Sequence, residues 1–271
     1  MIISTIVWLK DGVSLTPLSE KISKFETIKR RILFDYEILV KEFSFVITSI
    51  YHFAISFFQN YYSKKPTLPK DIQETTKVCI FIHGLGGGSF NFHFLAKKLY
   101  NAGFENLYAI DYTRKNGTIP IDELNVMIED IAKKSFQNKA KKLDITLIGH
   151  SLGGAISLKY LLNKENKQKD IKISNIISIS GVLKFHQSKF SWLCKDMKSD
   201  LDKIDSSHTS EGLNGCNLYS FRGEKDRVIP KEATFIQKDE KKEFSYSHLG
   251  HGNIILSNKV ANKIIELLNK N

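Results

Sequence analysis

Short apolar runs alternate with amphipathic stretches from about Val78 to the end of the chain. Predicted strands cover residues 78–82, 106–111, 144–148, 173–180, 217–221 and 243–247. Predicted helices lie near residues 91–102, 121–139, 153–164, 231–237 and 254–269. Most of the strand runs lack strict apolar–polar alternation, which is typical of strands covered by helices on both faces. The pattern therefore predicts an α/β fold, a compact doubly wound and mostly parallel sheet of about six strands.

The first seventy residues follow a different pattern. Residues 24–62 contain no proline or glycine, which predicts one or two long helices. Residues 43–62 also lack Asp, Glu, Lys and Arg, and they match the length of about 20 residues that a helix needs to cross a bilayer. A narrow polar stripe nevertheless recurs along them, at Ser44, Thr48, His52, Ser56 and Gln59.

Three interpretations of residues 43–62 remain open: a transmembrane helix, a helix lying in the membrane interface, and a helix packed on the following domain. The chain thus divides into an N-terminal helical extension at residues 1–70, predicted to associate with membranes, and a domain at residues 71–271. The N-terminus lacks a basic region before its short apolar run, so we expect no cleavable signal peptide. The expected location is membrane-associated through the extension and otherwise cytoplasmic.

Composition narrows the classes of partner. Forty Lys and Arg residues outnumber 29 Asp and Glu residues, for a net charge of +11. The lysines are spread along the chain and form no basic stripe with interleaved aromatic residues, so we expect no nucleic-acid partner. An anionic membrane surface suits this charge. Three cysteines without a CxxC pair argue against a disulfide framework and against structural zinc.

Residues 149–153 read Gly-His-Ser-Leu-Gly, which matches the pattern G-x-S-x-G. Glycines and a serine could simply mark a turn and a helix cap, but here a predicted strand ends at Ile148 and a helical pattern follows Ser151. Glycines two positions to either side of the serine leave room for a strained turn. The context predicts a strand-to-helix turn that exposes Ser151 as a nucleophile.

A nucleophilic serine needs a base, and the base needs an acid that orients it. On this type of sheet the acid and then the histidine follow the serine, each after a later strand. Asp226 comes shortly after strand 217–221, with Glu224 as the alternative acid. His251, which two glycines flank after strand 243–247, is the predicted base, with His248 as the alternative.

The loop after the first predicted strand reads IHGLGGGSFNF (residues 82–92). An oxyanion hole needs two N–H donors, and we assign them to the backbone of Leu152 and of Leu85. The rival interpretation is a phosphate-binding loop, but the Gly-Lys-Ser/Thr ending is missing, and only Asp111 could supply the acid of a dinucleotide site. His83 and His150, in the two motif loops, are expected to orient the backbone.

Four segments together resemble the α/β-hydrolases, and more narrowly the class 2 lipases typified by the small secreted Bacillus lipase. They are IHGLGGGSFNF, LYAIDYTRKNGT (107–118), IGHSLGG (148–154) and GHGNIILSNKV (250–260). The resemblance runs from about Val78 to the C-terminus. It implies Ser151 as nucleophile, Asp226 as acid, His251 as base, and Leu85 and Leu152 as oxyanion donors. It also implies hydrolysis of carboxylic esters, acylglycerols included, without a metal or cofactor.

Three features depart from that family, and one is the loop that carries the acid, which is short in the small lipase and gives the weakest alignment. The helical extension stands where the small lipase has a signal peptide, and residues 184–216 are longer than a minimal connection and predict a lid or acyl-binding flap. The expected function is a serine carboxylic-ester hydrolase acting on lipid-like acyl esters. The alternatives are thioesterase, acyltransferase or amidase chemistry on the same triad, or a non-catalytic membrane-tethered scaffold.

Overall fold

The computed structural model describes residues 40, 43–48, 50, 51, 54, 74–112, 121–163, 169–183, 213, 215–234 and 242–270. The chain divides into two compact units, Met1–Val40 and Lys41–Asn271. Most of the predicted extension lies outside the described residues, and so does the predicted lid except for Leu213, Gly215 and Cys216. All elements below belong to the second unit.

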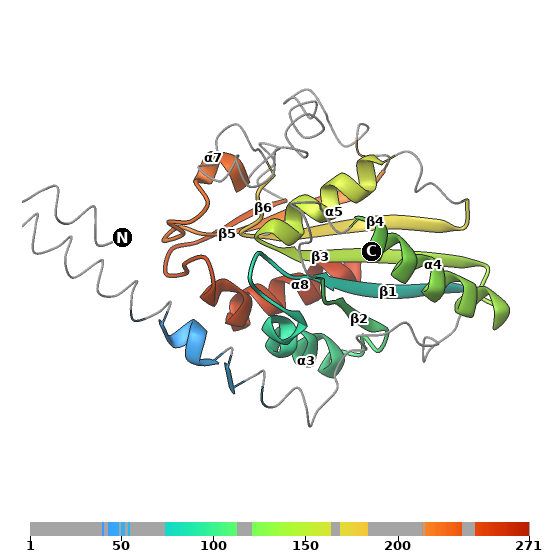
Figure 1. Ribbon diagram of the computed structural model, residues 1–271, viewed down its shortest axis with the longest axis horizontal. Coiled ribbons are helices and arrows are strands. Elements are labelled where there is room, and N and C mark those ends of the chain that lie inside the picture. Colours follow the sequence, from blue (N-terminus) through green and yellow to red (C-terminus); the bar gives the residue numbers. More distant parts are fainter. Residues whose placement is uncertain are drawn as a thin grey trace, which may run out of the picture. The chain divides into compact units, whose positions relative to one another are not determined.

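The described residues form one sheet of six strands (Figure 1). The strands are β1 (Thr75–Ile82), β2 (Leu107–Ile110), β3 (Lys142–His150), β4 (Ile171–Ile179), β5 (Asn217–Gly223) and β6 (Glu243–Tyr246). Their order is β2-β1-β3-β4-β5-β6, and every neighbouring pair is parallel. The prediction of an α/β fold with a parallel sheet is confirmed.

Helices cover both faces of this sheet. They are α3 (His93–Asn101), α4 (Ile121–Gln137), α5 (Leu152–Leu162), α7 (Lys231–Thr234) and α8 (Asn258–Lys270), with short 3-10 turns η2 (Ser89–Phe92) and η5 (Asn253–Leu256). The core beneath α4 and α5 contains Ile80 and Ile176, whereas the core beneath α3 and α8 contains their neighbours Phe81 and Ile177. Successive strand residues point to opposite faces, so two covered faces require unbroken apolar runs.

The strand order places two loops side by side at the carboxyl edge of the sheet. β1 and β3 are neighbours, with Ile82 in register with Gly149. The chain leaves β1 toward α3 on one face and leaves β3 toward α5 on the other. Such a switch point opens a crevice beyond the strand ends. The glycine-rich loop and the serine turn therefore meet there.

Helical residues 43–48, 50, 51 and 54 precede the sheet and are coloured blue in Figure 1; we call them the N-terminal helical segment. Among the described residues, no helix is both long enough and apolar enough to cross a membrane. Residues 55–62, the second half of the apolar stretch singled out in the sequence, lie outside the described residues.

Candidate active site

Ser151 occupies a strained turn between β3 and α5. Its φ of 54° and ψ of −119° lie in a region that non-glycine residues rarely adopt. A Cβ on Gly149 would lie 2.3 Å from the carbonyl of Gly153, and a Cβ on Gly153 would lie 1.9 Å from the carbonyl oxygen of Ile82. Both glycines of the motif are therefore required by space, and they allow α5 to start close against β1 and β3.

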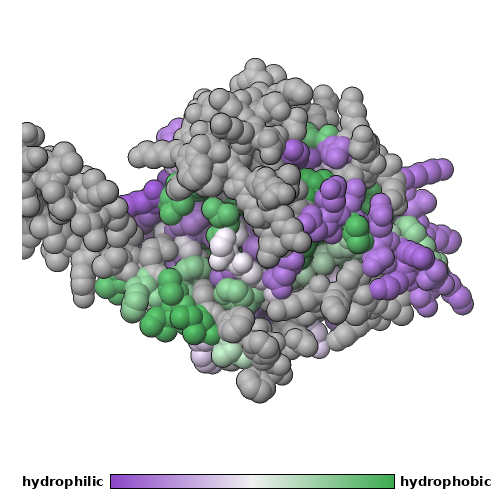
Figure 2. Space-filling view, in the orientation of Figure 1, coloured by the Kyte–Doolittle hydropathy of each residue, from purple (hydrophilic) through white to green (hydrophobic). Residues whose placement is uncertain are grey.

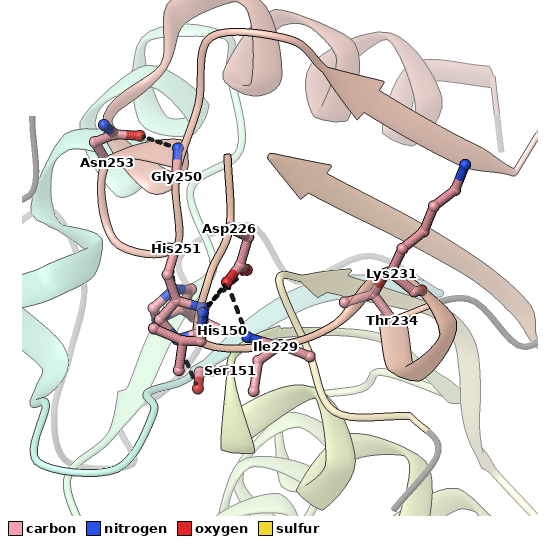
Figure 3. A network of polar contacts seen from close by, with 10 residues as sticks. His150, Ser151, Asp226, Ile229, Lys231, Thr234, Gly250, His251 and Asn253 are labelled. Carbon is pink, nitrogen blue, oxygen red and sulfur yellow. Dashed lines mark hydrogen bonds and ion pairs between the residues drawn. The ribbon is translucent and has the colours of Figure 1, made fainter. Parts of the chain in front are cut away.

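Ser151, His251 and Asp226 form a continuous chain of polar contacts (Figure 3). The Nε2 atom of His251 lies 3.0 Å from the Ser151 Oγ, and its Nδ1 atom lies 2.9 Å from the Asp226 Oδ2. The Asp226 side chain is fully buried, and that of His251 is 15% exposed. Glu224 and His248, the alternatives left open by the sequence, are exposed. The structure thus brings together the residues preferred from sequence.

The Asp226 carboxylate is held by several donors. The backbone N–H groups of Val228 and Ile229 each donate to its Oδ1 at 2.9 Å, while His251 occupies its Oδ2. Burial alone would raise the pKa of Asp226, but the hydrogen bond and charge of His251, together with the Ile229 N–H, outweigh burial and lower it. Asp226 is therefore ionised at neutral pH and can stabilise a protonated imidazole.

Backbone hydrogen bonds join the loop that carries the acid to the loop that carries the histidine. Glu224 N donates to the Tyr246 carbonyl at 2.9 Å, and Lys225 N donates to the Leu249 carbonyl at 3.0 Å. A Cβ on Gly223 would lie 2.1 Å from the same Leu249 oxygen, so only glycine permits this approach. The two loops form one rigid support, which fixes the separation of Asp226 and His251.

His150 links the nucleophile turn to that support. Its Nε2 lies 2.8 Å from the backbone carbonyl oxygen of His251, so this nitrogen carries the proton and donates it. Burial, reinforced by the neighbouring His251, lowers the pKa of His150 to about 3. The ring is therefore neutral. The sequence predicted that His150 orients backbone; the structure identifies the backbone concerned as that of His251.

His83 controls the glycine-rich loop in a similar way. Its Nε2 accepts the Tyr112 N–H at 3.3 Å, which leaves the proton on Nδ1, and Nδ1 lies 2.8 Å from the Gly84 carbonyl oxygen. Burial lowers the pKa of His83 and keeps it neutral. The Gly84 carbonyl and the Leu85 N–H belong to one planar trans peptide and point in opposite directions. Fixing the carbonyl therefore fixes the direction of the Leu85 N–H.

The residues expected to supply the oxyanion donors adjoin segments that contact or contain Ser151. A Cβ on Gly84 would lie 2.8 Å from the Ser151 Cβ, so the glycine-rich loop packs directly against the serine. Leu152 is the first residue of α5, where a backbone N–H has no partner within the helix. The glycine-rich loop and the start of α5 thus both lie next to Ser151.

Asp111 and Tyr112, just after β2, anchor the glycine-rich loop. The Ser89 hydroxyl donates to the Asp111 Oδ2 at 2.8 Å and its N–H to the Oδ1 at 2.5 Å. The Tyr112 hydroxyl donates to the His83 carbonyl at 2.7 Å, and the two rings stack with centroids 4.0 Å apart. Asp111 thus binds Ser89, whereas the rival interpretation of a dinucleotide site required Asp111 to bind a ribose. The sequence-based prediction did not include this support. The usable signal was that Asp111 and Tyr112 directly follow β2, the strand that pairs with β1.

Within the described residues, no group of three or more His, Cys, Asp or Glu side chains could hold a metal ion. The described thiols, Cys79 and Cys216, are buried, and burial raises the pKa of each to about 12. They are protonated and unreactive at neutral pH.

Known structures share this architecture. A truncated carbohydrate esterase from gut microbiota is 14% identical, with a TM-score of 0.53, over 78% of this chain and 94% of that one. Esterase B from Lactobacillus rhamnosis, studied with a tributyrin phosphonate, is 12% identical, with a TM-score of 0.50, over 87% and 94%. A bifunctional GH43-CE protein from Bacteroides eggerthii is 17% identical, with a TM-score of 0.54, over 75% of this chain and only 35% of that one. These likenesses show the fold.

A family model described as serine aminopeptidase, S33, matches residues 73–212. The matched region contains β1 to β4, the glycine-rich loop and Ser151, and it ends before Asp226 and His251. It spans just over half of the sequence. The chain therefore belongs to the serine aminopeptidase S33 family of α/β-hydrolases.

Proposed function

We propose that this protein is a serine hydrolase that cleaves carboxylic esters with lipid-like acyl groups. The single observation that best supports this is the position of His251, with Nε2 3.0 Å from the Ser151 hydroxyl and Nδ1 2.9 Å from the buried Asp226. A serine so placed, in a strained turn at the start of a helix, is the arrangement that activates a hydroxyl for acyl transfer.

In the first half-reaction, His251 Nε2 accepts the Ser151 proton as Oγ bonds to the ester carbonyl carbon. The negative charge that develops on the carbonyl oxygen is stabilised by the N–H groups of Leu85 and Leu152. Asp226 stabilises the imidazolium that forms. His251 then gives the proton to the departing alkoxide, so that the alcohol leaves and an acyl-serine ester remains.

In the second half-reaction, water replaces the alcohol. His251 accepts a proton from the water as its oxygen attacks the acyl-serine carbonyl, and the same two N–H groups stabilise the second oxyanion. Collapse of this intermediate breaks the bond to Ser151 Oγ, which regains its proton from His251. The carboxylic acid leaves, and the triad returns to its starting protonation state.

The preference for a lipid-like ester rests on the side chains around the triad. Leu85, beside the nucleophile, is 54% exposed, and Val228, two residues beyond the acid, is 41% exposed. Apolar side chains in solvent at this rim favour an acyl chain over a charged peptide terminus. Thioesterase, acyltransferase and amidase activity use the same triad and are the competing proposals, the last being the one that the family description suggests.

The test uses p-nitrophenyl esters of short and long acyl chains and the matching p-nitroanilide amides. Ser151→Ala should lower kcat by at least about 10⁴-fold, because no other group replaces the nucleophile. Ser247→Ala, an exposed serine in the turn after β6, is the matched control and should retain the wild-type rate. Equal rates for Ser151→Ala and wild type would refute the serine mechanism, and faster cleavage of the amides would assign the protein to amidases.

A further inference from the structure

The N-terminal helical segment has its apolar side in solvent. Its exposed large apolar side chains occupy positions separated by three or four residues, which is the spacing of a single helical face. They are Phe43, Val46, Ile47, Ile50 and Tyr51, each at least half exposed. We call these five residues the apolar face; the segment is coloured mostly green in Figure 2, and its sequence contains no Asp, Glu, Lys or Arg. A surface helix ordinarily turns such a stripe toward the protein core.

The other side of the segment is seated on the loop that carries the histidine of the triad. The ring of Phe45 is partly buried in the core beneath α3 and α8, and a Cβ on Gly252 would lie 2.5 Å from its Cδ1. Gly252 directly follows His251. Ser44 and Thr48 face the same way, since both line, with Phe45 and Leu249, a cavity of about 420 Å³ between the segment and this loop. The segment is thus held beside the triad, at the carboxyl edge of the sheet.

Other exposed apolar side chains gather at the same edge. Two of the exposed large apolar residues in the described part of the chain lie near the triad. Leu85 belongs to the glycine-rich loop, and Val228 belongs to the loop that carries Asp226. The remaining ones outside the apolar face are Val40, Tyr100 and Val126. Exposed apolar area is therefore concentrated on the segment and around the triad, and such concentration marks an interaction surface.

We infer that the apolar face of the N-terminal helical segment docks on an anionic phospholipid bilayer and holds the triad against the membrane surface, an inference that rests on the proposed hydrolysis of lipid-like esters. The face is aliphatic and aromatic, and it inserts among acyl chains without needing a shaped partner. The net charge of +11 adds attraction to acidic headgroups. The ester then enters the site directly from the bilayer.

A flotation assay tests this docking with the full chain. Vesicles of phosphatidylcholine containing phosphatidylglycerol are compared with vesicles of phosphatidylcholine alone. The double substitution Ile47→Glu with Ile50→Glu should weaken binding to the acidic vesicles by at least about tenfold, because it places two charges in the inserted face. Val126→Glu changes an equally exposed valine on α4 and should bind like the wild type. The wild type and each variant should bind vesicles of phosphatidylcholine alone more weakly than vesicles that contain phosphatidylglycerol.

Three further measurements separate this inference from its rivals. The double variant should cleave a soluble short-chain ester at the wild-type rate, while losing activity on an ester embedded in vesicles. Ser151→Ala should still float, because docking does not use the Ser151 hydroxyl. A wild-type protein that floats but cleaves no ester would refute the proposed chemistry and leave the docking intact. Flotation of the double variant like wild type, or no binding by the wild type, would overturn the docking. A wild-type dimer that the double variant converts to a monomer would assign the face to a second copy instead.

Discussion

The side chain of His150 donates a hydrogen bond from its Nε2 to the backbone carbonyl of His251, over 2.8 Å. This bond ties the residue before Ser151, the proposed nucleophile, to His251, the proposed base. The nucleophile turn starts from β3 and the histidine loop follows β6, at opposite sides of β4 and β5. A neutral, buried imidazole therefore spans the two parts of the site that must keep a separation of 3.0 Å.

The burial of His150 makes the stability of the protein depend on pH. Its pKa is lowered from 6.5 to about 3 on folding, so below pH 6.5 the unfolded chain binds a proton that the folded chain does not. The stability present above pH 6.5 is lost as the pH falls toward 3, at about 1.4 kcal/mol per pH unit. Denaturant unfolding at several pH values measures this slope.

The variant His150→Gln should show a shallower slope, because an amide can donate to the His251 carbonyl without titrating. His83, whose pKa burial also lowers, contributes in the same direction in both proteins. Parallel curves for the variant and the wild type between pH 6.5 and 4 would show that His150 is not the titrating group.

Asp226 and Glu224 offer a matched pair of acidic residues two positions apart. Asp226→Asn should lower kcat by about 10³–10⁴-fold with little effect on KM, because the amide can no longer stabilise the imidazolium. Glu224→Gln removes an exposed carboxylate from the same loop and should leave kcat within about twofold. The kinetics of the two variants on a short p-nitrophenyl ester make the comparison. The assignment fails if Glu224→Gln is the impaired variant.

We predict that Tyr112 affects catalysis by holding the glycine-rich loop in place. Tyr112→Phe removes the hydroxyl that donates to the His83 carbonyl at 2.7 Å while keeping the ring stacked on the imidazole. A looser His83 allows the Gly84–Leu85 peptide to rotate, so kcat should fall about tenfold, less than the loss of a whole oxyanion donor. Tyr100→Phe, on an exposed tyrosine of α3, is the control.

The two tyrosine variants also distinguish positioning from general support of the fold. If Tyr112→Phe lowers the unfolding midpoint in denaturant and leaves kcat unchanged, the hydroxyl serves only stability. A fall in kcat with KM and the unfolding midpoint preserved assigns it to the orientation of the oxyanion donor.

Much of the fold could be predicted because local patterns determine it. Apolar runs, most of them without alternation, identified the strands, and the G-x-S-x-G pattern located the turn at Ser151. The choice between Asp226 and Glu224 was harder, because both follow β5 within three residues. It depended on which carboxylate faces His251, and that is set by hydrogen bonds from Val228 and Ile229 to Asp226.

The sequence by itself determined the alternation of strands and helices, the place of the strained serine, and the order of Ser151, Asp226 and His251 along the chain, since all of these follow from spacing. Only the tertiary structure decided that Asp111 anchors the loop at Ser89, that His150 supports His251, and that Phe45 rather than Ile47 packs beside Gly252. These contacts join residues far apart in sequence. A helical period shows that a helix has two unlike faces, but only packing against other elements selects the face that turns inward.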